Sequence, residues 1–267
     1  MQVADTGLAA ETLGSGPPLI VLHDLFASAA SWRGVARALA ASHRVICVDL
    51  RNHGRSPRAV SMDHTEMADD VLCLIEREGL DRPTVVGHGL GGKVAMTLAL
   101  TAPYAVGRLA VLDIAPDTDA QPWARQMQAM REVLTHGRIA ATGGAEPAMP
   151  RLATRNAYTD WRSNLAAIAR AIPALSGFPR HLRYLGSDVP LHAILGARSD
   201  WVLPANAEAF APMFPSATVE QIADAGHWIH ADQREALVAS LRRVLDAPAH
   251  ETDRIATTPR QSQETTP

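Results

Sequence analysis

The sequence is poor in cysteine and aromatic residues, and no uninterrupted apolar run approaches membrane length. Two cysteines in 267 residues are too few for a disulfide framework, and both Cys47 and Cys73 lie in patterns typical of small core residues. No apolar run reaches the roughly 20 residues that span a bilayer. The net charge of −3 does not provide the excess of positive charge that is typical of nucleic-acid-binding proteins. Because the first residues also lack a signal-peptide pattern, we expect a cytoplasmic protein with one core.

Apolar runs of strand length recur along the chain. They are nearly continuous rather than alternating, which is typical of strands buried on both faces of a parallel sheet. Residues 67–75 and 237–245 show helical periodicity instead. The alternation predicts an α/β fold with a mostly parallel, doubly wound sheet. The runs are residues 19–22, 45–48, 84–86, 109–112 and 191–195.

The strand rhythm stops in the middle of the chain. Residues 117–186 contain helical spacing, in 123–133 and again in 161–172, and no convincing strand. We expect a helical cap over the carboxyl ends of the strands, where such sheets bind ligands. The core is then formed by residues 1–116 and 187–250. The polar, aperiodic residues 251–267 are typical of a disordered tail.

The most informative segment is Thr84-Val-Val-Gly-His-Gly-Leu-Gly-Gly-Lys, in which a strand leads through a glycine-rich turn into a helix. Gly87, Gly89 and Gly91 have the spacing of a nucleophile elbow, which places a serine at a strained turn of positive φ. The middle position here is Gly89. The nucleophilic oxygen of that motif is therefore absent.

Six segments in the same order resemble the α/β-hydrolase family, and they span most of the chain outside the tail. The resemblance is to the small bacterial and mitochondrial serine esterases, with haloperoxidases and epoxide hydrolases as relatives. It implies the fold of that family, and it places Gly89 where the serine stands. The segments are Leu22-His-Asp-Leu-Phe, Asp49-Leu-Arg-Asn-His-Gly-Arg-Ser-Pro, Gly87-His-Gly-Leu-Gly-Gly-Lys-Val-Ala-Met, Asp113-Ile-Ala-Pro, Gly196-Ala-Arg-Ser-Asp-Trp-Val and Gly226-His-Trp-Ile-His-Ala-Asp.

The resemblance implies a catalytic base and leaves its acid partner open. His227 follows a strand ending at 221–224 and precedes the last helix, which is the family position of the general base. The usual acid position holds Ser199, so the partner is either Asp113, which we prefer, or the neighbouring Asp200. His88, like His23 and His53, stands at a motif position that looks structural.

The oxyanion hole shows a second departure from the family. Its two backbone N–H groups are expected to be those of Leu25 and Leu90, and the family's His-Gly reads His23-Asp24 here. A carboxylate directed inward at about 6 Å would oppose a developing oxyanion by roughly 3 kcal/mol at an effective dielectric constant of 20. Either orientation of Asp24 is compatible with the sequence, and we favour the outward one.

Without the serine, acyl-enzyme chemistry is not expected, because losing such a nucleophile costs on the order of a millionfold in turnover. Two enzymatic readings remain for a hydrophobic small-molecule substrate, with no cofactor and no metal. In the first, a water in the space above Gly89 is activated by His227 and hydrolyses an ester, lactone or epoxide. In the second, His227 and its acid partner move a proton in a non-hydrolytic cyclisation, elimination or decarboxylation.

Two alternatives compete with these readings: an esterase inactivated by an engineered Ser→Gly change at 89, and a non-catalytic binder of a small ligand. From the sequence we predict that Gly89→Ser raises the hydrolysis of short activated esters and restores covalent labelling by a fluorophosphonate probe. In every reading the pocket is expected to be lined by the same side chains. These are Asp24, His88, Trp123, Met127, Trp161, Trp201 and Trp228.

Overall fold

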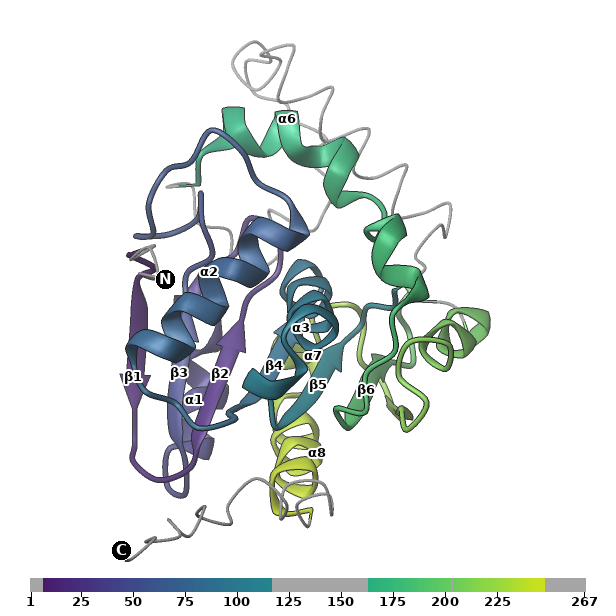
Figure 1. Ribbon diagram of the computed structural model, residues 1–267. Helices are drawn as coiled ribbons and strands as arrows, with labels where there is room; N and C mark the ends of the chain where they lie inside the picture. The colour runs from purple at the N-terminus through teal and green to yellow at the C-terminus, as the bar shows by residue number, and fades with distance from the viewer. Residues whose placement is uncertain (1–6, 117–162, 203, 248–267) are drawn as a thin grey trace, which may run out of the picture.

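The computed structural model describes residues 7–116, 163–202 and 204–247 (Figure 1). Within these residues the strands form one sheet in the order β1-β3-β2-β4-β5-β6-β7. All neighbours pair in parallel except β1, which is antiparallel to β3 at the edge. The strands are β1 (Ala10–Leu13), β2 (Pro18–Leu22), β3 (Arg44–Val48), β4 (Thr84–His88), β5 (Arg108–Leu112), β6 (Leu191–Gly196) and β7 (Thr218–Ile222).

The mostly parallel α/β sheet predicted from the sequence is confirmed. The five apolar runs are β2 to β6, whose residues are buried apart from their first or second positions. The two edge strands carry no such run, because an edge strand need not be buried on both faces. β1 is half-buried, and β7 is exposed except near its end. The strand expected to end at 221–224 ends at Ile222.

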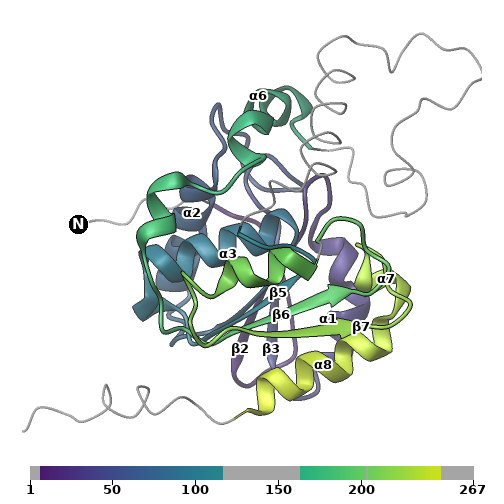
Figure 2. The ribbon, with the colours of Figure 1, turned by 90° about the vertical axis from the view of Figure 1, so that its right-hand side faces the viewer.

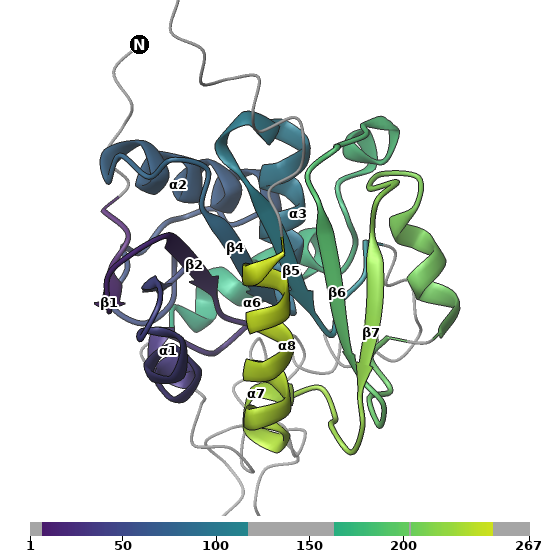
Figure 3. The same cartoon turned by 90° about the horizontal axis from the view of Figure 1, so that it is seen from below.

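Helices cover both faces of the sheet (Figures 2 and 3). One apolar core lies between the sheet and α2 (His64–Arg77) and α3 (Leu90–Thr101), and a second lies on the side of α1 (Arg33–Leu39) and α8 (Arg234–Asp246). The short α7 (Ile229–Asp232) precedes α8. The described residues also contain four 3₁₀ helices: η1 (Ala29–Trp32), η2 (Pro103–Ala105), η4 (Arg180–Tyr184) and η5 (Pro204–Phe210). No helix in the described ranges is both long and apolar enough to cross a membrane.

Helix α6 (Leu165–Leu175) falls within the stretch expected to form a cap (Figure 1). It is joined to the loop after β3, since Asn164 donates from its backbone to the carbonyl of Asn52 at 2.8 Å and from its side chain to Asn52 Oδ1 at 3.0 Å. The Lys93 ammonium donates to the carbonyl of Gly177 at 2.8 Å. The helix expected at 123–133 and the tail 251–267 lie outside the described residues. The boundaries of the cap therefore stay a prediction.

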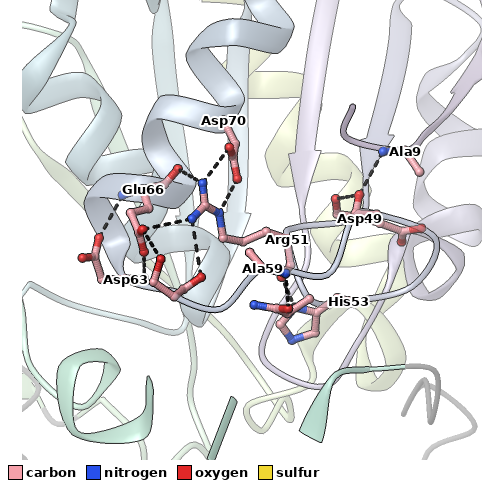
Figure 4. Close-up of polar contacts among 11 residues, drawn as sticks. Ala9, Asp49, Arg51, His53, Ala59, Asp63, Glu66 and Asp70 are labelled. Atoms are coloured by element: carbon pink, nitrogen blue, oxygen red, sulfur yellow. Dashed lines mark hydrogen bonds and ion pairs between the residues drawn. The ribbon is translucent and has the colours of Figure 1, made fainter. Parts of the chain in front are cut away.

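The loop after β3 is held by a cluster of charges (Figure 4). The Arg51 guanidinium makes two bonds to Asp70 on α2, at 2.5 and 2.8 Å, and lies 3.3 Å from Glu66. Asp49 accepts the N–H groups of Ala29 at 2.7 Å and of Arg55 at 3.0 Å. The motif that begins at Asp49 thus has a structural role: it fixes the loop beside the carboxyl ends of β2 and β3.

Replacing Arg51 by Met is expected to lower the free energy of unfolding by roughly 3 kcal/mol, because it leaves the carboxylate of Asp70 buried without its counter-ion. The Asp70 side chain is only 4% exposed. Urea denaturation measures the loss, and the double variant Arg51→Met/Asp70→Leu is expected to recover most of it. A single-variant loss below about 1 kcal/mol would contradict this account of the loop.

Candidate active site

The turn between β4 and α3 has the geometry of a nucleophile elbow. Gly89 has φ +50°, a conformation that side chains rarely adopt, and it is the residue that precedes the first turn of α3. A Cβ on Gly87 would overlap the carbonyl of Gly91, and a Cβ on Gly91 would overlap that of Leu22. The glycine spacing read from the sequence therefore reflects close approach of strand and helix.

The carboxylate of Asp24 lies directly over Gly89. A Cβ built on Gly89 would overlap Asp24 Oδ1. That oxygen accepts the N–H of Leu90 at 2.7 Å, and Asp24 Oδ2 lies 3.1 Å from His227 Nε2. The outward orientation that we favoured for Asp24 is wrong: the residue is 7% exposed and its carboxylate is directed inward. An N–H donor and an imidazole compensate for the loss of water there.

Hydrogen bonds fix the loop that carries Asp24. His23 donates from Nδ1 to the carbonyl of Asp24 at 2.7 Å and accepts the N–H of Leu50 at Nε2 at 3.0 Å. The N–H of Ala27 also donates to the carbonyl of Asp24, at 3.1 Å. His23 therefore has the structural role expected for it. Leu25 is buried beside Asp24, and its part in an oxyanion hole stays a prediction.

His227 and Asp113 form the inner half of a triad. His227 Nδ1 donates to Asp113 Oδ2 at 2.7 Å, and both side chains are buried. Asp113 follows β5 with φ +46° and also accepts the N–H of Gly196 at 3.1 Å and the hydroxyl of Ser199 at 2.5 Å. Asp200 is exposed. The structure thus pairs His227 with Asp113, the preferred of the two candidates.

Ser199 was not identified as part of this group from the sequence. Its hydroxyl holds the Asp113 oxygen that faces His227, and it also accepts the N–H of Trp201 at 3.2 Å. The available signal was its place at the usual acid position of the family, three residues after Gly196. A hydroxyl at that position can only support an acid that comes from another strand.

Aromatic rings enclose the imidazole of His227. Trp201 stacks on it with ring centroids 4.3 Å apart and an interplanar angle of 16°. His88 lies 4.6 Å away and donates from Nε2 to the carbonyl of His227 at 2.9 Å, and Trp228 lies at 5.5 Å. Of the expected pocket residues, Trp123, Met127 and Trp161 lie outside the described residues. The others meet around His227.

The site holds an ion pair at neutral pH. Burial opposes the charged ring of His227, but hydrogen bonds and charge from Asp113 and Asp24 outweigh it and raise the pKa of His227 to about 9. Burial likewise opposes the charge of Asp24, yet the hydrogen bond and charge of His227 hold the pKa of that carboxyl well below its ordinary value. Burial and the charge of His227 lower the pKa of His88 to about 4, so His88 is neutral.

The free energy of unfolding is expected to fall as pH rises from about 6.5 to above 9. A group whose pKa is higher in the folded state stabilises the fold at low pH, and this contribution is lost as the folded His227 releases its proton. The loss is on the order of 3 kcal/mol at 1.36 kcal/mol per pKa unit. Urea denaturation between pH 6 and 10 measures it. A His227→Gln variant with the same slope would show that other groups cause the effect.

Asp24, His88 and His227 are the group in the described residues whose arrangement could hold a metal ion. Each offers one ligand atom, and these atoms lie within 4.8 Å of one another. Both oxygens of Asp24 and both nitrogens of His227 already take part in hydrogen bonds. An ion would have to replace the contact between Asp24 and His227. The absence of a metal requirement stays a prediction, and turnover unchanged by dialysis against EDTA is its expected result.

Comparison with known proteins agrees with this geometry. A family model described as alpha/beta hydrolase fold matches residues 17–233. The chain belongs to the α/β-hydrolase family. This α/β hydrolase is 32% identical over 254 residues to the sn-1-specific diacylglycerol lipase ABHD11 of Xenopus tropicalis, which is 87% of this chain and 79% of the lipase. It is 28% identical over 256 residues to esterase YbfF of Escherichia coli, covering 89% and 96% of the two chains.

A solved structure, a marine microorganism esterase, superimposes on this α/β hydrolase with a TM-score of 0.73 at 26% identity, covering 89% of this chain and 99% of that one. A shorter match, 38% identical over 122 residues, relates 43% of the chain to 40% of a fluoroacetate dehalogenase from a Burkholderia species. The small-esterase resemblance seen in the sequence is therefore confirmed. The chain is a hydrolase-fold enzyme, and its relatives are named as esterases and lipases.

Proposed function

We propose that this α/β hydrolase is a cytoplasmic enzyme that hydrolyses a hydrophobic small molecule, an ester, lactone or epoxide, without a serine acyl-enzyme. One observation carries the proposal: the Asp24 carboxylate lies over Gly89 and contacts both the Leu90 N–H and His227. The proposal assigns the catalysis of hydrolysis to three side chains in a line, Asp24, His227 and Asp113, in which His227 contacts both aspartates.

Serine-type acyl transfer lacks two of its parts at this elbow. Position 89 has no hydroxyl, and the Leu90 N–H that would stabilise an oxyanion on a substrate carbonyl is occupied by Asp24 Oδ1. The water expected above Gly89 is also displaced, because the carboxylate occupies that space. The sequence led us to expect a neutral His227 that acts as a base on water. In the resting site His227 is instead protonated and lies between two carboxylates.

This protonation state suits a reaction that releases an oxygen leaving group. The His227 Nε2 proton faces Asp24, which is the less buried of its two carboxylate partners. The Asp24 side chain is 10% exposed, whereas that of Asp113 is fully buried. A proton there can pass to the departing oxygen of an ester, lactone or epoxide. Asp113 and Ser199 hold the ring on its other side and stabilise its charge.

The proposal is tested by incubating the enzyme with p-nitrophenyl acetate, δ-valerolactone and styrene oxide and analysing products by mass spectrometry. We expect hydrolysis of at least one compound, with a loss of at least about 10³-fold in His227→Ala, as for removal of a catalytic acid–base. The matched control is His192→Ala, which alters a histidine of β6 that bonds to Thr218 and Glu220 instead. Binding without any product would indicate a binder. An isomerised product would indicate the non-hydrolytic reading.

A fluorophosphonate probe gives an independent test of the missing serine. The wild-type enzyme is expected to remain unlabelled at concentrations that label an ordinary serine esterase, because Gly89 offers no hydroxyl and the Leu90 N–H is occupied. Stoichiometric labelling of a serine elsewhere in the chain would contradict the proposed mechanism. Labelling can be located by peptide mass spectrometry.

A further inference from the structure

We propose that Asp24 is the nucleophile of this enzyme and that its substrates are epoxides, whose strained ring opens onto the Asp24 carboxylate. The inference rests on the proposed function and extends it, because it names the attacking atom and one of the three substrate classes. The nucleophile would then come from the loop after β2, and the elbow after β4 would supply only its backbone.

The two oxygens of Asp24 have different surroundings, as a carboxylate nucleophile requires. Oδ1 is bound by the Leu90 N–H at 2.7 Å, at the start of helix α3. Oδ2 lies beside His227 Nε2 at 3.1 Å. The helix N-terminus and the N–H thus stabilise one oxygen while the other remains available for attack.

The same contacts decide against an acyl substrate. When a carbonyl carbon is attacked, negative charge develops on the substrate oxygen, and an N–H must be directed at it. Here the Leu90 N–H is already bound to Asp24 itself. It can stabilise charge only on the carboxyl group of Asp24. That charge develops when an ester of Asp24 is hydrolysed, so the site is arranged for an alkylated Asp24.

The first step forms this ester. Asp24 Oδ2 attacks a ring carbon of the epoxide, a C–O bond of the ring breaks, and its electron pair stays on the ring oxygen. That oxygen takes the Nε2 proton of His227 and becomes a hydroxyl. The products are a hydroxyalkyl ester of Asp24 and a neutral His227, so charge and protons balance. An alkyl halide would leave without taking a proton, and His227 would stay charged.

The second step needs the neutral imidazole that the first step leaves. His227 takes a proton from water, which attacks Cγ of Asp24, and the developing charge on Oδ1 is stabilised by the Leu90 N–H. The intermediate collapses, and the alcohol oxygen departs with a proton as a diol. Of the two protons of the water, one is on the diol and one is on His227. The ion pair of Asp24 and His227 is restored.

The decisive experiment is a single turnover in H₂¹⁸O with enzyme in excess over styrene oxide, cyclohexene oxide or 1,2-epoxyhexane. If Asp24 is the nucleophile, ¹⁸O appears in the peptide that contains Asp24 and the diol carries none. If the ¹⁸O appears in the diol instead, water attacks directly; the assignment of Asp24 is overturned, and the proposed hydrolase function stands. A purely structural role for Asp24 cannot place ¹⁸O in its side chain.

Two variants extend the test. His227→Gln is expected to form a covalent adduct of one epoxide per chain on Asp24 more slowly than the wild type, because the first step loses its proton donor, and then to retain it, because the second step loses its base. Asp24→Asn is expected to form neither adduct nor diol, while Asp188→Asn, which alters an exposed carboxylate, keeps wild-type turnover. Thermal unfolding midpoints check that each variant folds. An adduct located on another residue overturns the assignment.

The failures of the two proposals can be told apart. If the enzyme hydrolyses p-nitrophenyl acetate or the lactone but none of the three epoxides, the epoxide assignment falls and the hydrolase function remains. If no compound of either set is hydrolysed, both proposals fall. Diol formation with ¹⁸O in Asp24 supports both.

Discussion

A chain that carries both Gly89→Ser and Asp24→Gly is expected to react with a fluorophosphonate probe and to hydrolyse p-nitrophenyl acetate, whereas Gly89→Ser alone does neither. The reason is steric and electrostatic. A side chain at position 89 would overlap the Asp24 carboxylate, and Asp24 also occupies the Leu90 N–H that the serine intermediate needs. From the sequence alone, one serine looked sufficient.

The double variant rebuilds the His-Gly pattern at residues 23–24 and leaves His227 with Asp113 as its only carboxylate partner. A loss of the Asp24 charge removes one cause of the raised pKa of His227, so the ring can act as a base near neutral pH. A serine nucleophile with its base is worth on the order of a millionfold. We expect at least about a thousandfold of this to return in kcat over Gly89→Ser.

Initial rates with p-nitrophenyl acetate and intact mass after probe treatment measure the effect. Asp24→Gly alone is the matched control, because it opens the N–H without supplying a hydroxyl. Labelling of Gly89→Ser alone as fast as that of the double variant would contradict the proposed coupling between residues 24 and 89. It would mean that Asp24 moves aside without cost. If confirmed, the two departures from the family pattern are one coupled change, in which each residue requires the other.

Asp113→Asn is expected to lower kcat by about 10⁴-fold on whichever compound the wild-type enzyme hydrolyses. If the NH₂ group of the asparagine faces the ring, it cannot accept a hydrogen bond from His227 Nδ1–H, and the imidazole tautomer protonated at Nε2 is favoured instead. The imidazolium also loses a counter-charge. Asp113 is also the partner whose hydrogen bond contributes most to raising the pKa of His227. The variant therefore loses both orientation and charge.

Steady-state kinetics from pH 6 to 10 test this second prediction. Ser199→Ala is the graded control: it removes one hydrogen bond to Asp113 and leaves the carboxylate in place, so its loss should be far smaller. Asp200→Asn removes the exposed alternative acid. A loss in Asp200→Asn comparable to that in Asp113→Asn would show that the acid partner in solution differs from the one seen here.

Much of the fold could be read from the sequence because its signals are local. Continuous apolar runs follow from burial on both faces of a parallel sheet, and they identified the five central strands. A Cβ at Gly87 or Gly91 would overlap a backbone carbonyl, whereas Gly89 has φ +50° and its Cβ would overlap the Asp24 carboxylate. The edge strands were harder to recognise, because partial exposure removes the apolar run that marks a central strand.

The sequence by itself determined the α/β-hydrolase fold, the elbow at Gly89 and the place of His227, since each follows from short local motifs and from the order of those motifs along the chain. Only the tertiary structure decided where the Asp24 carboxylate points and which aspartate His227 binds. Both depend on partners brought together from distant strands: Asp24 meets Leu90 and His227, and Asp113 meets Ser199 and His227. A buried charged side chain takes the orientation in which it finds hydrogen-bond and ion-pair partners. The segment that carries the side chain does not specify which residues those partners are.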